Sequence, residues 1–234
     1  MLISIAIAFS CSVPGCAARH APLIGQAPMP YAWIDDDAAL SELRARARRI
    51  ATVQATCQIV LTKPGHTVHL DGAMAARFPG QMRVRAWKLG NAIFDAAIRD
   101  GTAYMHDATP EREAEVIVAR ALTDMCELLG PQFIERADWE RTNPAPQLRG
   151  TLRGGRVVAC EVDRTTLAIR RLVINDGVEI LVRDHREFDG MLWPTTIELN
   201  SPQGSILVHC TDVALNVVLP DAAISPSARA RIVQ

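Results

Sequence analysis

The stretch from His66 to His106 constrains the fold most strongly, because turn signals divide it into short alternating runs. These signals are Phe78-Pro79-Gly80, Lys88-Leu89-Gly90-Asn91 and Arg99-Asp100-Gly101. Short runs between clusters of Gly, Pro and Asp are typical of consecutive antiparallel strands. The sequence therefore predicts an antiparallel meander over this stretch.

Alternation along each run assigns its residues to the two faces of the sheet. One face is apolar and contains Val68, Leu70, Met74, Ala76, Met82, Val84, Ala86, Phe94, Ala96 and Ile98. The opposite face contains Arg83, Arg85, Asn91 and Asp95. A sheet with one apolar face must place that face against other elements, so the rest of the chain is expected to supply the cover.

Two helices and six further strands are expected outside the meander. Residues 35–50 begin with three aspartates, which favour a helix start, and carry an apolar stripe of Ala39, Leu40, Leu43, Ala47 and Ile50. Residues 109–129 begin with Thr-Pro-Glu and end before Gly130-Pro131, which predicts the second helix. Residues 131–150 look irregular. Strands are expected at 51–63, 156–163, 167–174, 179–186, 194–200 and 205–213.

The helix expected over residues 109–129 is unusually apolar. A surface helix needs an apolar stripe of only about 100°, and this one exceeds it, so it is expected to be covered on more than one side. Strands in series, then a helix, then strands in series predict an α+β fold with a single large antiparallel sheet. Such a sheet must curl to bury its inner face, which gives an incomplete, half-open β-barrel.

The N-terminal residues have the pattern of an export signal. Residues 2–10 form an apolar run that is too short to span a bilayer as a helix. Val13-Pro14-Gly15-Cys16 resembles a bacterial lipobox, in which Cys16 would become the lipidated first residue. An ordinary signal cleaved near Ala17-Ala18 and a cytosolic protein stay open as alternatives. The chain thus divides into a signal peptide (1–16), an extended tether (17–33), a folded domain (34–226) and a frayed tail (227–234).

Composition and motifs limit the function. The 234-residue chain has a formal net charge of −1 and 5% aromatic residues, which argues against nucleic-acid binding. It contains no GxSxG motif, no Walker loop and no GxGxxG after a strand, so neither an enzyme nor a cofactor is expected. His66-x-x-His69 does not predict a metal site, because residues three apart on a strand point to opposite faces.

Four cysteines fall within the expected strands and the second helix: Cys57, Cys126, Cys160 and Cys210. They form no CxxC motif, so zinc and redox motifs are absent. They are interpreted as small buried side chains, while pairing between two of them in an exported protein stays open. The carboxylates at Asp184, Glu187 and Asp189 lie beside arginines and are interpreted as a solvated, charged hairpin.

The meander also carries a family resemblance. A strand with small residues at 72–76, then RFPGQMRVRAW (77–87) and FDAAIRDGTAYMH (94–106), resembles the periplasmic lipoprotein carriers LolA and LolB. GMLWPTTIEL (190–199) and ALNVVLPDAAI (214–224) resemble the end of the same superfamily. The resemblance covers residues 34–224 and implies helices that close the concave side of the sheet, including the helix over 109–129.

The resemblance further implies a non-enzymatic envelope lipoprotein that binds acyl chains of a lipid or lipoprotein. Its lipid anchor would place it in the outer membrane, facing the periplasm. The turn at Lys88-Leu89-Gly90 is the candidate for the protruding hydrophobic loop of the acceptor protein. The alternative function is a periplasmic sensor or protein-interaction module on the same fold.

An apolar cavity between sheet and helix is the expected binding site. The residues predicted to line it are Val68, Leu70, Met74, Met82, Phe94, Ile117, Leu122, Met125 and Leu129. Methionine suits an adaptable apolar site. The alternative is that these side chains fill a solid core.

Overall fold

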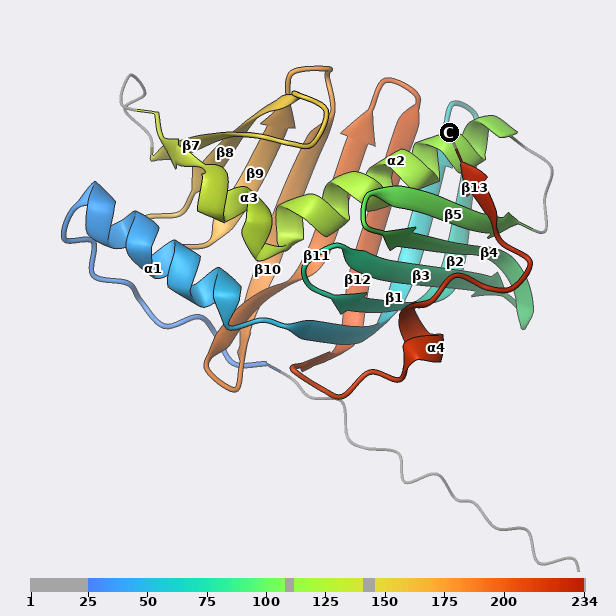
Figure 1. Ribbon diagram of the computed structural model, residues 1–234, viewed down its shortest axis with the longest axis horizontal. Helices are drawn as coiled ribbons and strands as arrows, with labels where there is room; N and C mark the ends of the chain where they lie inside the picture. The colour runs from blue at the N-terminus through green and yellow to red at the C-terminus, as the bar shows by residue number, and fades with distance from the viewer. Residues whose placement is uncertain (1–24, 108–111, 141–145, 234) are drawn as a thin grey trace, which may run out of the picture.

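A computed structural model describes residues 25–107, 112–140 and 146–233 of the chain (Figure 1). The side chains of residues 107 and 112–117 are outside this description. The predicted signal peptide, its Cys16 and residues 17–24 of the predicted tether also lie outside it. No helix in the described ranges is long and apolar enough to cross a membrane.

The described strands form one antiparallel sheet, built from two meanders. The sheet has 13 strands in the order β13-β5-β4-β3-β2-β1-β12-β11-β10-β9-β8-β7-β6. The first meander contains β1 (Thr52–Lys63), β2 (His66–Arg77), β3 (Gln81–Lys88), β4 (Asn91–Arg99) and β5 (Thr102–Asp107). The second meander contains β6 (Asp138–Trp139), β7 (Gln147–Thr151), β8 (Val157–Val162), β9 (Ile169–Ile174), β10 (Glu179–Phe188), β11 (Met191–Ser201) and β12 (Gly204–Leu215).

The two meanders meet where β1 pairs with β12, a junction that we call the seam. β6 and the C-terminal β13 (Arg231–Val233) are the outermost strands and do not pair with each other. The sheet is therefore open, as the sequence predicts for an incomplete barrel. The predicted fold class is confirmed.

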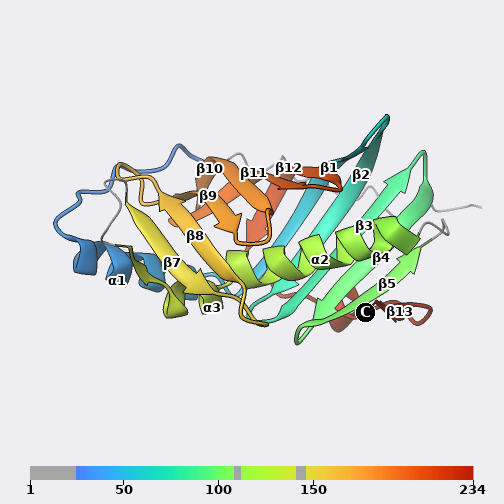
Figure 2. The ribbon, with the colours of Figure 1, turned by 90° about the horizontal axis from the view of Figure 1, so that it is seen from above.

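Helices pack on both faces of the sheet, and one short helix lies on the face opposite to the longest helix. The longest, α2 (Arg112–Leu129), runs across the strands, and Figure 2 shows the sheet curving around it. α1 (Asp36–Arg48) and the short α3 (Pro131–Arg136) lie at the second-meander end of α2. α4 (Asp221–Ile224) packs on the opposite face of β2 and β3, where Ala75, Leu219 and Ile224 form a small separate core.

α1 begins where the three aspartates predict. The Asp35 side chain caps the helix, since its Oδ1 accepts a hydrogen bond from the Ala38 backbone N–H at 2.7 Å. Two further aspartates lie in the first turn and two arginines in the last, an arrangement that the helix dipole favours. Leu40 and Leu43 are buried on its inner face.

The alternation predicted for the strands is confirmed. Val53, Ala55, Cys57 and Ile59 of β1 are buried, while the residues between them are exposed. Met74 pairs with Val84, and Val84 with Ala96, so the predicted apolar faces of β2, β3 and β4 coincide. This face forms the main core together with α2.

Two segments that the sequence analysis treated as unstructured form regular elements. Residues 131–150 contain α3, β6 and most of β7. Phe133 and Ile134, which are buried in an otherwise polar stretch, pack α3 into the core. Residues 231–233 of the expected frayed tail form β13, which pairs with β5. This pairing satisfies backbone groups that would otherwise line an open sheet edge.

Residues 25–33 of the predicted tether are docked onto the domain. Gln26 and Glu187 exchange two backbone hydrogen bonds of 2.9 Å. The Tyr31 backbone N–H donates to the Thr165 carbonyl at 2.6 Å. Trp33 lies against Trp139, with 5.3 Å between ring centroids. The expected tether is therefore too long, since Tyr31 and Trp33 are partly buried against the folded domain.

Candidate functional site

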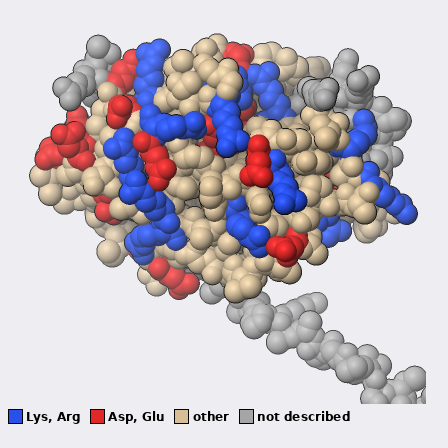
Figure 3. Space-filling model, viewed as in Figure 1, with Lys and Arg blue, Asp and Glu red and all other residues tan. Residues whose placement is uncertain are grey.

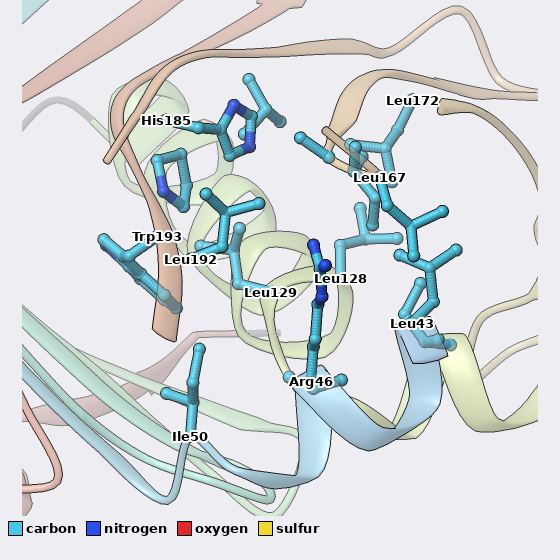
Figure 4. Close-up of a pocket in the computed structure, with 17 residues that line it drawn as sticks. Leu43, Arg46, Ile50, Leu128, Leu129, Leu167, Leu172, His185, Leu192 and Trp193 are labelled. Carbon is cyan, nitrogen blue, oxygen red and sulfur yellow. The ribbon is translucent and has the colours of Figure 1, made fainter. Parts of the chain in front are cut away.

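An apolar pocket lies where α1, the junction of α2 and α3, and strands β9 to β11 converge (Figure 4). Its cavity volume is about 100 Å³. The walls are Leu43, Arg46, Ala47, Ile50, Leu128, Leu129, Gly130, Ile134, Leu167, Ala168, Ile169, Leu172, Val182, His185, Leu192, Trp193 and Pro194. Nearly all of these are apolar, so the pocket suits an apolar ligand group.

Local sequence patterns explain why these side chains meet. Leu43, Ala47 and Ile50 recur at helical spacing and present one apolar stripe of α1 and its end to the pocket. α2 ends at Leu129, and Pro131 starts α3 after the extended residue Gly130. This break in the helical path turns the end of α2 into a wall of the pocket.

Two polar side chains face the apolar walls. The Arg46 guanidinium is held in place, because its Nε donates to Glu42 Oε1 at 2.8 Å and its Nη1 donates to the Thr166 carbonyl at 2.9 Å. It also lies over the Tyr31 ring, 5.6 Å from the centroid. The pocket therefore has a fixed cation at its edge.

His185 is the second polar group. Burial away from water, together with the positive charge of Arg170, lowers the pKa of His185 to about 4. The imidazole is therefore neutral near pH 7. The pocket thus combines apolar walls, a neutral ring and an arginine whose charge is balanced by Glu42, which is suited to an apolar chain with a polar end.

Charged side chains attach the second half of α2 to the second meander. Asp124 is buried and pairs with Arg156, whose Nη1 lies 3.0 Å from Asp124 Oδ2. Arg156 also contacts Asp176 at 3.3 Å, and Arg120 pairs with the same Asp176. We call Arg120, Asp124, Arg156 and Asp176 the ion-pair cluster. Its carboxylates raise the pKa of Arg156.

A second charged contact lies one turn further along α2. Glu127 is buried, and its two carboxylate oxygens share the Arg153 backbone N–H, at 3.0 and 3.1 Å from the nitrogen. It also pairs with Arg136 of α3. The part of α2 nearest the pocket is therefore attached by polar contacts as well as by apolar packing.

The predicted lining residues lie mostly in the main core and outside the walls of the pocket. Leu70, Met74, Met82, Phe94, Leu122 and Met125 are all buried in the main core. Val68 is half-buried against this core, and the side chain of Ile117 lies outside the described part. Leu129 is the one member of the predicted set among the walls of the pocket.

The sequence analysis missed Arg46, His185 and Trp193 as pocket residues. It identified the apolar stripe of α1 and the Leu-Trp-Pro segment of β11 without bringing them together. Periodicity shows which face of an element is apolar, but the side-by-side placement of α1 and β11 depends on the topology of the whole sheet. An arginine inside an apolar helical stripe was the available signal for Arg46.

The remaining candidate clusters have structural explanations. His66 and His69 are exposed on β2, and the described residues contain no group of three or more His, Cys, Asp or Glu that could hold a metal ion. Arg44, Arg46 and Arg48 of α1 pair with Asp138, Glu42 and Glu135. Figure 3 shows acidic and basic side chains interspersed on the face that carries α1.

The single antiparallel sheet curves around a long helix and stays open, so the chain has the architecture of a half-open barrel. The solved structures show that this is the LolA-like fold. A LolA superfamily protein from Nitrosomonas europaea is 11% identical, with a TM-score of 0.54 over 82% of this chain and 98% of that chain. A DUF1329 family protein from Desulfovibrio piger is also 11% identical, with a TM-score of 0.58 over the same shares.

A putative outer membrane lipoprotein-sorting protein domain from Vibrio parahaemolyticus is 10% identical, with a TM-score of 0.53 over 80% of this chain and 96% of that chain. No known family matches the sequence by its family model, and no curated protein matches it significantly. The predicted LolA/LolB-like fold is thus confirmed. At identities of 10–11% the likeness concerns the fold alone.

Proposed function

We propose that this chain is a non-enzymatic carrier or acceptor of the bacterial cell envelope that binds acyl chains of a lipid or lipoprotein. The observation that carries the proposal is the apolar pocket between the curved sheet and the helices of a LolA-like fold. Arg46 at its edge, which is paired with Glu42, would donate a further N–H group to the ligand's polar end. The apolar walls would take up its hydrocarbon.

The size of the pocket defines how much ligand it accepts in this conformation. A cavity of about 100 Å³ is small beside the roughly 300–1,000 Å³ of typical ligand sites. It suits the end of one chain. Burying about four methylenes there would contribute about 3 kcal/mol, which gives weak and reversible binding.

A longer chain would require α2 to move away from the sheet. Such a movement would expose Leu122 and Met125 of α2, which belong to the same buried core as Met74 and Met82. The lining that the sequence analysis proposed would then belong to a wider, open form of the same site. The polar attachment of α2 near the pocket supports opening from that end, because water can solvate Asp124 and Glu127 once they separate from their partners, whereas apolar side chains gain nothing from water.

The anchor belongs to the same proposal. Cys16 would carry the lipid, and Gly25 begins the described chain, so residues 17–24 would span at most roughly 29 Å. The domain would therefore stay close to the membrane. Replacing Cys16 by Ser should leave an unlipidated protein in the aqueous phase; an unmodified wild type that already partitions there would contradict the anchor.

Leu89 is a second apolar side chain that bears on the proposed function. It lies at the tip of the β3–β4 hairpin with 91% of its surface exposed. Its φ of 50° is in the left-handed region, which a leucine rarely adopts, so neither burial nor backbone preference explains its presence. We assign it to contact with a membrane or an apolar cargo, as the resemblance to the acceptor's loop suggests.

Binding of a fluorescent acyl probe to delipidated protein tests the proposal. Leu192→Phe should fill the pocket and weaken probe binding roughly tenfold, a loss of about 1.4 kcal/mol. Ile93→Phe enlarges a half-buried strand residue of the first meander and should leave binding unchanged. Equal effects of the two changes would contradict the site. No binding to wild type would leave the sensor or interaction module as the better function.

A further inference from the structure

Two buried thiols face each other at the centre of the seam. Cys57 of β1 and Cys210 of β12 are both free, and their Sγ atoms lie 3.6 Å apart. Their exposed fractions are 4% and 5%. The other two cysteines of the described domain, Cys126 and Cys160, are buried and each lacks a cysteine neighbour of this kind within the described contacts.

A β-bulge produces this juxtaposition. Thr56 pairs with Asp212, but the next residue, Cys57, pairs with Cys210, so Thr211 is the extra residue. The hydroxyl oxygens of Thr56 and Thr211 lie 3.0 Å apart, which holds the bulge. An uninterrupted register would place Cys57 opposite Thr211. The bulge therefore brings both thiols to the same position on the buried face.

Paired positions of an antiparallel ladder suit a disulfide. Opposed residues have Cα atoms about 4.5–5.5 Å apart, inside the roughly 4.4–6.8 Å found for disulfides. The sulfur atoms must approach from 3.6 Å to about 2.05 Å. Rotation of the two side chains about their Cα–Cβ bonds would bring the sulfur atoms together.

We propose that Cys57 and Cys210 form a cross-strand disulfide that joins the two meanders at the seam. The two thiols lose two protons and two electrons as the S–S bond forms. The acceptor is a disulfide-bearing oxidant, such as oxidised glutathione or an envelope dithiol oxidase, which becomes two thiols. The oxidising compartment rests on the proposed envelope location, whereas the pairing itself rests only on the geometry.

The timing of the bond follows from burial. The contact with Cys210, and then burial, raise the pKa of the Cys57 thiol, so little reactive thiolate exists in the folded domain. The bond therefore forms while β1 and β12 are assembling. Once formed, it closes a loop of 153 residues, which restricts the unfolded chain strongly. β1–β12 is the one strand pairing that links the two meanders in the described sheet.

Refolding of the full chain with reduced and oxidised glutathione, followed by alkylation and peptide mapping, tests the proposal. We expect a Cys57–Cys210 linked peptide, 2 Da lighter than the sum of its parts, and a melting temperature several degrees above that of the reduced protein. Cys126→Ala should keep the linked peptide, and Cys210→Ala should lose it together with the melting shift.

Quantitative alkylation of both cysteines after this refolding, or pairing of Cys57 with Cys126 or Cys160, would overturn the proposal. Acyl-probe binding is measured separately on the same samples. A protein that forms the disulfide and binds no probe would contradict the proposed function and support the cross-strand bond. A protein that binds the probe but keeps both thiols free would contradict the cross-strand bond and support the proposed function.

Discussion

The two ends of α2 lie in different environments. Toward the first meander, α2 packs on β3, β4 and β5 over a closely packed core that includes Met82 and Ile98, with exposed fractions of 0% and 2%. Toward the second meander, it ends beside a pocket and is attached through Asp124 and Glu127. Among the described side chains of α2, charged contacts support the end beside the pocket. A helix attached in this way is suited to open from its polar end.

The largest expected effect tests the solid first-meander core. Ile59 of β1 is 1% exposed, so Ile59→Asp would bury an unpaired carboxylate and should cost more than about 4 kcal/mol of unfolding free energy. Gln58→Asp on the exposed face should cost less than about 0.5 kcal/mol. Denaturant titration measures both, and similar losses would show that the faces are misassigned.

The second-largest effect distinguishes a core residue of α2 from a pocket residue of the same helix. Met125 is 4% exposed in the core, so Met125→Ala should leave a void and cost about 2–5 kcal/mol. Leu129 is half-buried at the pocket wall, so Leu129→Ala should cost less stability and change acyl-probe affinity more. Paired melting and probe titrations compare them. If Met125→Ala alters probe affinity with little loss of stability, the cavity extends beneath α2.

A smaller effect is expected at the ion-pair cluster. Asp124→Asn removes the charge that faces Arg156 and should cost about 2 kcal/mol. It should also speed hydrogen exchange in the second half of α2 and quicken acyl-probe uptake. Asp221→Asn, which removes a partner of Arg77 beside α4 on the opposite face of the sheet, is the control and should leave both rates unchanged. Unchanged exchange in Asp124→Asn would contradict opening from this end.

The smallest effect concerns pH. The folded-state pKa of His185 is lowered from 6.5 to about 4, so the folded protein disfavours its protonation. The contribution of His185 to stability is present above about pH 6.5 and is lost as pH falls toward 4. We expect a loss of about 1–2 kcal/mol from this group. Denaturation at pH 7 and pH 4.5 should differ less in His185→Gln; an identical difference would exclude His185.

Much of the fold could be predicted because local patterns determine it. The alternation in β1 and the turn sequences of the first meander define faces and pairings within a few residues of one another. The apolar breadth of α2 correctly indicated cover on several sides. β13 and the docked residues 25–33 were missed, because their order depends on contacts with Met105 and Glu187, far away in the sequence.

Only the chemical character of the site, and not its position, could be predicted from the sequence. An apolar space beneath helices follows from the composition of the sheet and of α2, but its position depends on which side chains fill the space. The methionines at 74, 82 and 125 are buried in the main core. The pocket forms instead where four remote segments leave a gap, around Leu43, Leu129, Leu167 and Leu192. No single segment carries a pattern for that gap.

Photo-crosslinking with a diazirine fatty acid tests the central claim most directly. On full-length, delipidated protein we expect labels in the pocket walls, on peptides that contain Leu129 and Leu192, and competition by unlabelled fatty acid. Leu192→Phe should reduce this labelling, whereas Ile93→Phe should not. Labelling that is absent, that resists competition, or that lies only on the outer face of the sheet around α4 would contradict acyl-chain binding at this site.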